Sequence, residues 1–226
     1  MTTEERVFRK KGKAHQKYVS ESGEVFPGVT TILGVINKPQ LVPWANKLGL
    51  QGIDSTRYVD ATATVGTLAH EMVQEYLGGP TWDRGRYAPE EVDLAENALL
   101  KFFEWEKHIT GKVETIAIEK PLLHEPRRYG GTIDWIGRIE GKTWLIDFKT
   151  SRALYPEHVY QIAAYNQLCW INDIEIQGVR IIKIGRNCSE GFEDKIISSE
   201  ELQYGEYVFI CALQLYRAID AYEKNR

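Results

Sequence analysis

Three consecutive segments rich in β-branched and aromatic residues occupy the middle of this sequence. They cover residues 113–123, 130–139 and 143–150. Turn-forming residues separate them at Glu125-Pro126 and at Glu140-Gly141. This composition is typical of strands, and such short breaks predict three neighbouring antiparallel strands. The centre of the chain is therefore expected to be a β-sheet.

Segments with helical periodicity lie on both sides of these strands. One helix is predicted from about Tyr58 to Leu77, where Gly78-Gly79-Pro80 ends it, and a second from Pro89 to about Ile109. The later predicted elements are a helix at 156–170, a core strand at 179–185, an edge strand at 192–197 and a helix from Ser198 or Ser199 to about Glu223. The order helix, three-stranded meander, helix, strand indicates a mixed α/β fold with additional N- and C-terminal helices.

The chain has 226 residues, and no repeat, low-complexity tract or linker divides it. This length suits a single domain. We expect residues 1–50 to form a basic arm, a hairpin and short helices, 58–185 the core, and 186–226 the edge strand and last helix. There is no apolar run of the roughly 18 residues that a membrane span requires, and no segment like a signal peptide. A cytoplasmic protein without a membrane partner is expected.

Two aspartates are predicted to lie opposite each other in the central hairpin. If the chain turns at Glu140-Gly141, then Asp134 pairs with Asp147, with Cβ atoms on the order of 5 Å apart. Like charges opposed on neighbouring strands destabilise a sheet unless something offsets them. A hard divalent cation does so, and Mg²⁺ commonly binds one or two carboxylates together with a substrate phosphate. The pattern favours a metal site.

Lys149 lies two residues beyond Asp147, so its side chain points to the same face of the strand. There it can orient or deprotonate an attacking water and stabilise charge on a phosphate. Two plainer interpretations stay open: a solvated surface pair of strands, and an Asp147–Lys149 ion pair without a catalytic role. Apolar neighbours argue against the first, because a buried charge needs a partner. These neighbours are Ile133, Trp135, Ile146 and Phe148.

Asp134 followed by Asp147-Phe148-Lys149-Thr150-Ser151 resembles the catalytic motif of the PD-(D/E)XK nuclease superfamily. The likeness is greatest to its RecB-like branch, which includes the mitochondrial genome maintenance exonuclease and the CRISPR-associated RecB-like nucleases. Further segments fit that branch, and the match covers roughly residues 64–168. These segments are Gly66-Thr67-Leu68-Ala69-His70, Glu119 within Ile116-Ala117-Ile118-Glu119-Lys120-Pro121, and Gln161 with Tyr165 in Tyr160-Gln161-Ile162-Ala163-Ala164-Tyr165.

The resemblance implies a restriction-endonuclease-like core and a Mg²⁺- or Mn²⁺-dependent nuclease. It implies a metal site formed by His70, Asp134, Asp147 and the carbonyl oxygen of Phe148. It also implies that Lys149 is catalytic, that Glu119 contacts the metal or supports its ligands, and that Gln161 and Tyr165 hold the lysine or contact the DNA backbone. Plainer interpretations remain: a structural histidine for His70, a strand surface charge for Glu119, and the border of an amphipathic helix for Gln161 and Tyr165.

The cysteines depart from the CRISPR-associated relatives. Those proteins carry an iron–sulfur cluster on four cysteines, one before the nuclease core and three after it. This chain has three cysteines, Cys169, Cys188 and Cys211, and none before residue 169. Four cluster ligands cannot be assembled, so we predict no iron–sulfur cluster.

The net charge of −4 gives no overall attraction to DNA, so binding would depend on local positive charge. Residues 6–17 carry several basic side chains and no acidic one. We predict that Lys10, Lys11 and Lys13 of this arm contact phosphates, as do Arg127 and Arg128 before the strand that carries Asp134. The alternative for the arm is a solvated charged segment.

The resemblance favours an exonuclease that acts on single-stranded or frayed DNA ends in repair, recombination or phage DNA processing. Its partners would be DNA and recombination or replication proteins, in the host cytoplasm if a phage encodes it. Three alternatives stay open: a structure-specific endonuclease, a catalytically silent DNA-binding module of the same fold, and a metal-dependent phosphohydrolase acting on nucleotides.

Overall fold

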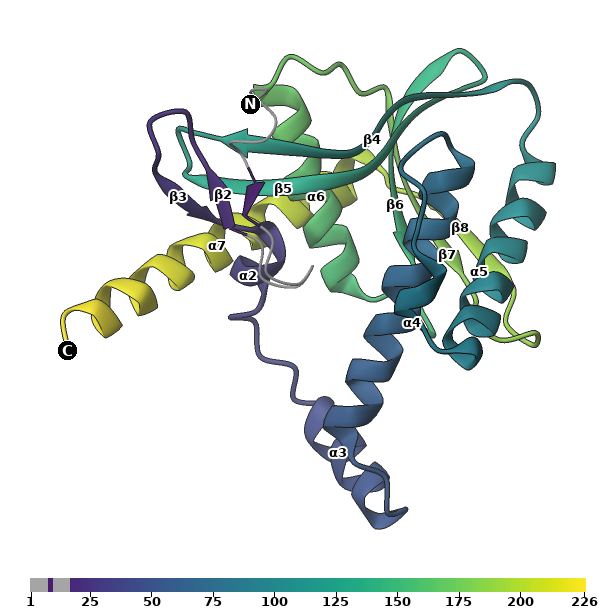
Figure 1. Cartoon of the computed structure of the whole chain (residues 1–226). Helices are drawn as coiled ribbons and strands as arrows, with labels where there is room; N and C mark the ends of the chain where they lie inside the picture. The colour runs from purple at the N-terminus through teal and green to yellow at the C-terminus, as the bar shows by residue number, and fades with distance from the viewer. Residues whose placement is uncertain (1–7, 10–16) are drawn as a thin grey trace.

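The computed structural model describes residues 8–9 and 17–226, and within them the fold is mixed α/β with a five-stranded sheet (Figure 1). The strand order is β4 (Val113–His124), β5 (Tyr129–Ile139), β6 (Lys142–Lys149), β7 (Gly178–Ile184) and β8 (Phe192–Ile196). The first three strands form the predicted antiparallel meander. Helix α6 (Pro156–Ile171) connects β6 to the parallel strand β7, and β8 adds the antiparallel edge.

Two layers of helices cover this sheet. Helices α4 (Ser55–Tyr76) and α5 (Pro89–His108) share one apolar cluster with the sheet, whose largest members include Phe102, Trp105, Trp135 and Phe148. Helices α2 (Val29–Leu33), α6 and α7 (Ser199–Lys224) share the other, with Tyr129, Ile133, Leu145 and Phe209. The sheet is therefore buried on both faces, as its apolar strands predict.

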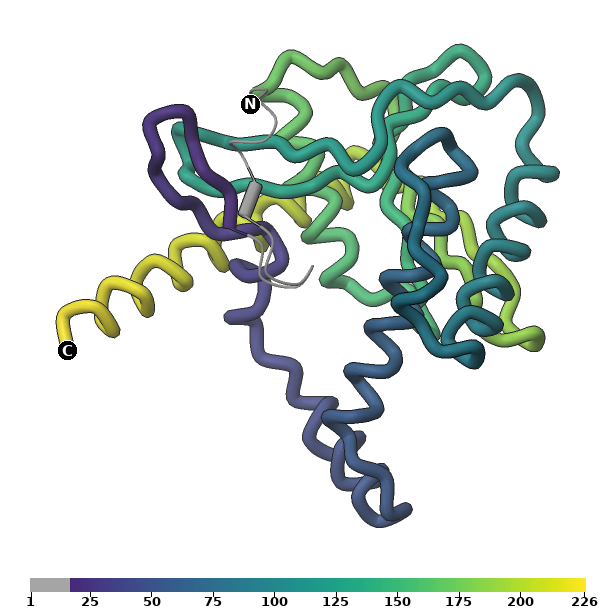
Figure 2. The backbone as a smooth tube through the Cα atoms, viewed as in Figure 1, coloured from purple at the N-terminus to yellow at the C-terminus, as the bar shows by residue number. Residues whose placement is uncertain are grey.

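The N-terminal part adds a small antiparallel sheet. It consists of β1 (Phe8–Arg9), β2 (Lys17–Val19) and β3 (Val25–Pro27), with the turn at the predicted Ser22-Gly23. A bridge between Gly28 and Gly130 joins the end of this segment to β5. Helix α3 (Leu41–Leu50) and the beginning of α4 project away from the central sheet (Figure 2). Within the described residues, no helix is both long enough and apolar enough to cross a membrane.

The turn between β5 and β6 confirms the predicted register. Glu140 has φ +52° and Gly141 φ +78°, the pair of positive values that a two-residue hairpin turn of the primed type requires. Ile139 pairs with Lys142, and the ladder continues to the pair Trp135 and Ile146. The next positions, moving further from the turn, are Asp134 and Asp147.

One helix boundary differs from the prediction and one short helix was not predicted, and an aspartate side chain caps each of them. Helix α4 begins at Ser55 rather than near Tyr58, since the Asp54 carboxylate accepts hydrogen bonds from the backbone N–H groups of Thr56 (2.8 Å) and Arg57 (3.2 Å). A short 3₁₀ helix, Arg84–Arg86, follows in the same way from Asp83, whose carboxylate accepts from the Gly85 N–H at 2.9 Å.

Helices α6 and α7 approach closely at Gly205. A Cβ atom placed there would lie 2.9 Å from the Cβ of Ala163 and 3.0 Å from the carbonyl oxygen of Val159. We expect Gly205→Ala to destabilise the protein by about 1–3 kcal/mol, because overpacking outweighs the gain in helix propensity. Gly49→Ala in α3 is the matched control, because beyond the adjoining residues and backbone of its own helix no described atom lies within 4 Å of its added Cβ. Urea unfolding should show a loss for Gly205→Ala only; equal midpoints would contradict this packing.

Candidate active site

A pocket of about 150 Å³ lies where the middle of β5 and the end of β6 meet α4 and α6. It brings together predicted residues that are far apart in the sequence: His70, Glu119, Asp134, Asp147, Lys149, Gln161 and Tyr165. A wider depression of about 520 Å³ lies between α6 and α7, and none of these seven residues lines it. The smaller pocket is therefore the candidate active site.

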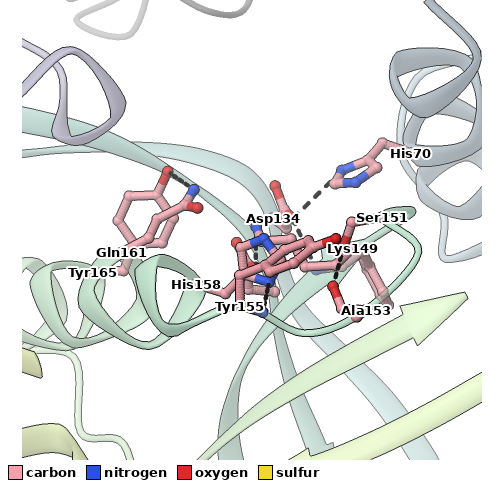
Figure 3. A network of polar contacts seen from close by, with 11 residues as sticks. His70, Asp134, Lys149, Ser151, Ala153, Tyr155, His158, Gln161 and Tyr165 are labelled. Carbon is pink, nitrogen blue, oxygen red and sulfur yellow. Dashed lines mark hydrogen bonds and ion pairs between the residues drawn. The ribbon is translucent and has the colours of Figure 1, made fainter. Parts of the chain in front are cut away.

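Asp134 is held by contacts from two elements (Figure 3). Its Oδ2 accepts a hydrogen bond from the backbone N–H of Phe148 at 3.0 Å and lies 3.4 Å from Nδ1 of His70 on α4. Burial raises the pKa of this carboxyl, but His70, Lys149 and the Phe148 N–H outweigh burial and lower the pKa to about 2. Asp134 therefore carries a negative charge at neutral pH.

Asp147 has a different environment and is more deeply buried than Asp134. Its side chain is 1% exposed and forms an ion pair with Lys149 through Oδ2. Among the described residues, Oδ1 has no hydrogen-bond partner. Burial raises the pKa of Asp147, and the charge of Asp134 raises it further, so that it reaches about 6 although Lys149 opposes both effects. A carboxylate oxygen in this state is ready to accept a cation or a proton.

The chemistry of these side chains suits a hard divalent cation. They comprise the carboxylates of Asp134 and Asp147 and the imidazole of His70, and among the described residues one oxygen of Asp147 has no hydrogen-bond partner. In the part of the chain that the structure describes, no group of three or more His, Cys, Asp or Glu side chains is arranged to hold a metal ion. His70 contacts Asp134 directly, and Lys149 contacts Asp147. A cation would thus have to displace these contacts.

Gln161 and Tyr165 lie together on α6, as their spacing predicts. Gln161 Nε2 donates a hydrogen bond to the Tyr165 hydroxyl at 2.9 Å. Burial, and then the charge of Asp147, raise the pKa of Tyr165, so it stays protonated. The ring of Tyr165 packs over Gly131 of β5, where an added Cβ would lie 2.6 Å from Cε1. This close approach of helix and strand places the pair in the pocket.

Glu119 of β4 lines the pocket from a position with unusual backbone geometry. Its φ of +46° is rare for a residue with a side chain, and it lies between the paired positions Ile118 and Lys120. Gln74 of α4, which is 4% exposed, donates a hydrogen bond to Glu119 Oε1. The flanking pairs, Ile118 with Trp135 and Lys120 with Ile133, place Glu119 opposite Asp134, so both carboxylates share one face of the sheet.

The N-terminal segment supplies a wall of the pocket that sequence reasoning missed. Tyr18, Val29 and Thr30 line it, together with Thr132 of β5. The Tyr18 hydroxyl and Thr132 Oγ1 are 3.0 Å apart, and the Tyr18 ring packs on Gly130. Thr132 lies two residues before Asp134, which was a usable signal because alternate strand residues share a face. No local signal identifies Tyr18.

Of the predicted DNA-binding residues, Arg127 and Arg128 do not line the pocket. Arg127 and Arg128 are in the turn between β4 and β5, where Arg127 pairs with Glu206 at 3.3 Å and Arg128 with Glu24 at 3.1 Å. Their positive charge is thus partly neutralised. Phe148 was predicted to contribute its carbonyl oxygen to the metal site. Its side chain is buried with Trp135 in the core, and only its backbone faces Asp134. Lys10, Lys11 and Lys13 lie outside the described residues.

Comparisons with known proteins add little to this geometry. No protein-family model matches the chain, and no curated protein matches it. Among solved structures, it is similar to the crystal structure of a candidate exonuclease from Eubacterium rectale, with a TM-score of 0.47 and 12% sequence identity. The match covers 69% of this chain and 66% of that one, so the chain spans just under two thirds of that structure's length. At this level of similarity the match carries no argument about function.

Proposed function

We propose that this protein is a divalent-metal-dependent nuclease that hydrolyses phosphodiester bonds in DNA. The observation that supports this most strongly is the pair of buried carboxylates in one small pocket beside a lysine. One of them, Asp147, has an oxygen without a hydrogen-bond partner in the described structure. Burying such a charge is costly without a function that uses it, and functional sites are where such perturbed groups gather.

The pocket residues would divide the work as follows. His70, Asp134, Asp147 and the Phe148 carbonyl oxygen would hold Mg²⁺ or Mn²⁺, which when bound activates water and neutralises charge on the scissile phosphate. Lys149 orients the attacking water and stabilises negative charge that develops on the phosphate. Gln161 and Tyr165 hold the substrate backbone or the lysine, and Glu119 supports the acidic side of the pocket.

Within this proposal the chain is a member of the RecB-like branch of PD-(D/E)XK nucleases and acts on single-stranded or frayed ends. The order of the motifs in the sequence supports the branch, as does their meeting in one pocket. The presence of both aspartates and the lysine favours an enzyme over a silent DNA-binding module. Cytoplasmic DNA repair, recombination or phage DNA processing, with the corresponding protein partners, would be the setting.

Digestion of labelled DNA tests the proposal. The substrates are end-labelled linear single strands, end-labelled linear duplexes and closed circular DNA, each with Mg²⁺, with Mn²⁺ and with EDTA. We expect shortening of the linear substrates with either metal, no cleavage in EDTA and survival of the circles. Cleavage of circles would instead indicate an endonuclease. Intact DNA under every metal condition would refute the nuclease, and release of phosphate from free nucleotides would favour a phosphohydrolase.

A further inference from the structure

The loop that follows Lys149 presents an aromatic side chain beside the candidate active site. It runs from Thr150 to Tyr155, and α6 begins at the next residue, Pro156. Tyr155 is 42% exposed. It lies six positions beyond Lys149, so their Cα atoms are at most about 20 Å apart even for extended chain. Figure 3 shows Tyr155 among the side chains around Lys149.

Local contacts fix this loop. Ser151 Oγ donates a hydrogen bond to the Ala153 carbonyl oxygen at 2.7 Å, and the Tyr155 backbone N–H donates to Nδ1 of His158 at 3.2 Å. The rings of Tyr155 and His158 meet edge to face, with centroids 5.5 Å apart and an interplanar angle of 75°. Tyr155 thus presents an exposed aromatic ring from a loop that these contacts hold in place. This lowers the entropy cost of binding a partner.

His158, which packs against Tyr155, also interacts electrostatically with Lys149. Burial lowers the pKa of His158 to about 3, and the neighbouring Lys149 charge contributes to the shift. The imidazole is therefore neutral at working pH, and it keeps its acceptor nitrogen for the Tyr155 N–H. The His158 imidazole and the ammonium group of Lys149, the proposed catalytic residue, are therefore close enough to interact electrostatically. Tyr155 and the cleaved phosphate would then lie within a few nucleotides of each other.

We propose that Tyr155 stacks on an unpaired nucleobase of the strand that is cleaved at Lys149. This inference rests on the proposed nuclease function and adds to it a residue that contacts the bases of the single-stranded substrate. Aromatic side chains beside a backbone-binding site serve as platforms for unpaired bases, which offer the same π face whatever their sequence. Trp135, the aromatic residue nearest in sequence to Asp134, cannot do this because it is fully buried.

Stacking predicts a position-specific effect on binding. Tyr155→Ala should weaken binding of single-stranded DNA by about 5- to 100-fold. Tyr155→Phe should bind like the wild type, because it keeps the ring. Tyr155→Leu, which keeps apolar packing on His158 without an aromatic face, should resemble the alanine variant. Tyr204→Ala is the matched control, since Tyr204 is 64% exposed on α7 and lies away from the pocket.

The experiment combines these variants with a set of oligonucleotides that carry one abasic site at successive positions. Affinity is measured in EDTA, kcat and KM with Mg²⁺, and Tm for every variant. We expect one or two abasic positions to weaken wild-type binding by the same factor as Tyr155→Ala, and to have no further effect on that variant. KM should rise and kcat should stay within a few-fold.

The outcomes separate the two proposals. A wild-type protein that cleaves DNA but shows no abasic position linked to Tyr155 overturns the stacking proposal alone. Equal affinity of Tyr155→Ala and wild type does the same, as does a Tyr155→Phe variant as weak as the alanine variant. A wild-type protein that cleaves no DNA with either metal overturns the proposed function itself.

Discussion

Asp147→Asn should abolish DNA cleavage and at the same time stabilise the metal-free protein at pH 8. Cleavage should fall by about 10³-fold or more, because the substitution removes one of the two carboxylates on which the site depends. Stability should rise because the wild-type side chain is almost fully buried, with its pKa raised by burial. An active-site substitution that stabilises the fold is expected where function requires a costly buried charge.

The dependence on pH gives the sign of this effect. The folded pKa of Asp147 is about 6, against an ordinary value of 3.8, so the folded protein binds its proton more tightly than the unfolded chain. The wild type therefore loses stability as pH rises from about 4 to about 6, and the penalty persists at pH 8. Asparagine carries no charge to bury, so the variant should gain on the order of 1–3 kcal/mol at pH 8.

Urea unfolding in EDTA at pH 4 and pH 8, with cleavage assays in Mg²⁺, measures both effects. The stability difference should be large at pH 8 and small at pH 4. Added Mg²⁺ or Mn²⁺ should reduce the difference at pH 8, because only the wild type gains binding energy from the cation. Asp93→Asn, on the exposed face of α5, is the matched control. A variant that still cleaves would remove Asp147 from the mechanism, and one destabilised at pH 8 would contradict its costly burial.

Lys149→Ala should also abolish cleavage but should shift stability in the opposite direction. Loss of the ammonium removes stabilisation of the reacting phosphate, worth about 10²- to 10⁴-fold in rate. It also leaves the buried Asp147 carboxylate without its ion-pair partner, so the metal-free protein should be less stable at pH 8. DNA affinity should change by only a few-fold, because one positive charge among several phosphate contacts is lost.

The double variant Asp147→Asn, Lys149→Ala separates catalysis from stability. Its cleavage should be no lower than that of the worse single variant, because residues that act as one unit fail together. Its stability should exceed that of Lys149→Ala, since the uncompensated carboxylate is gone. Lys142→Ala at the exposed start of β6 is the control for loss of a lysine from the same strand. Near wild-type cleavage by Lys149→Ala would leave the pair as an ion pair without a catalytic role.

The elements of this fold could be predicted because local signals specify them. The turn Glu140-Gly141 fixes which residues face each other across β5 and β6, and a two-residue periodicity then places Asp134, Asp147 and Lys149 together. The glycine and proline breaks set most helix ends within a few residues. These predictions depend only on neighbours in the chain, which is why they hold without knowledge of the whole molecule.

The pKa of each aspartate in the site could not be predicted, because it depends on how deeply the side chain is buried in the folded protein. Asp134 and Asp147 have similar apolar neighbours in the sequence, yet the pKa is lowered for one and raised for the other. The difference arises because α4 brings His70 to Asp134, while Asp147 lies deeper in the sheet. The sequence could identify both carboxylates as site residues but could not predict which of the two has the lower pKa.

The composition of the pocket wall was also decided by tertiary structure. Tyr18 reaches the site because the N-terminal hairpin packs on Gly130, more than a hundred residues away in the chain. The Glu119 carboxylate is held there by a hydrogen bond from Gln74 of α4. Sequence alone determined the strands, the hairpin register and the acidic and basic residues that share a face, since each follows from backbone geometry over a few residues. Which side chains complete the pocket, and how strongly each carboxylate is charged, followed only from long-range packing, because burial and proximity are properties of the folded chain.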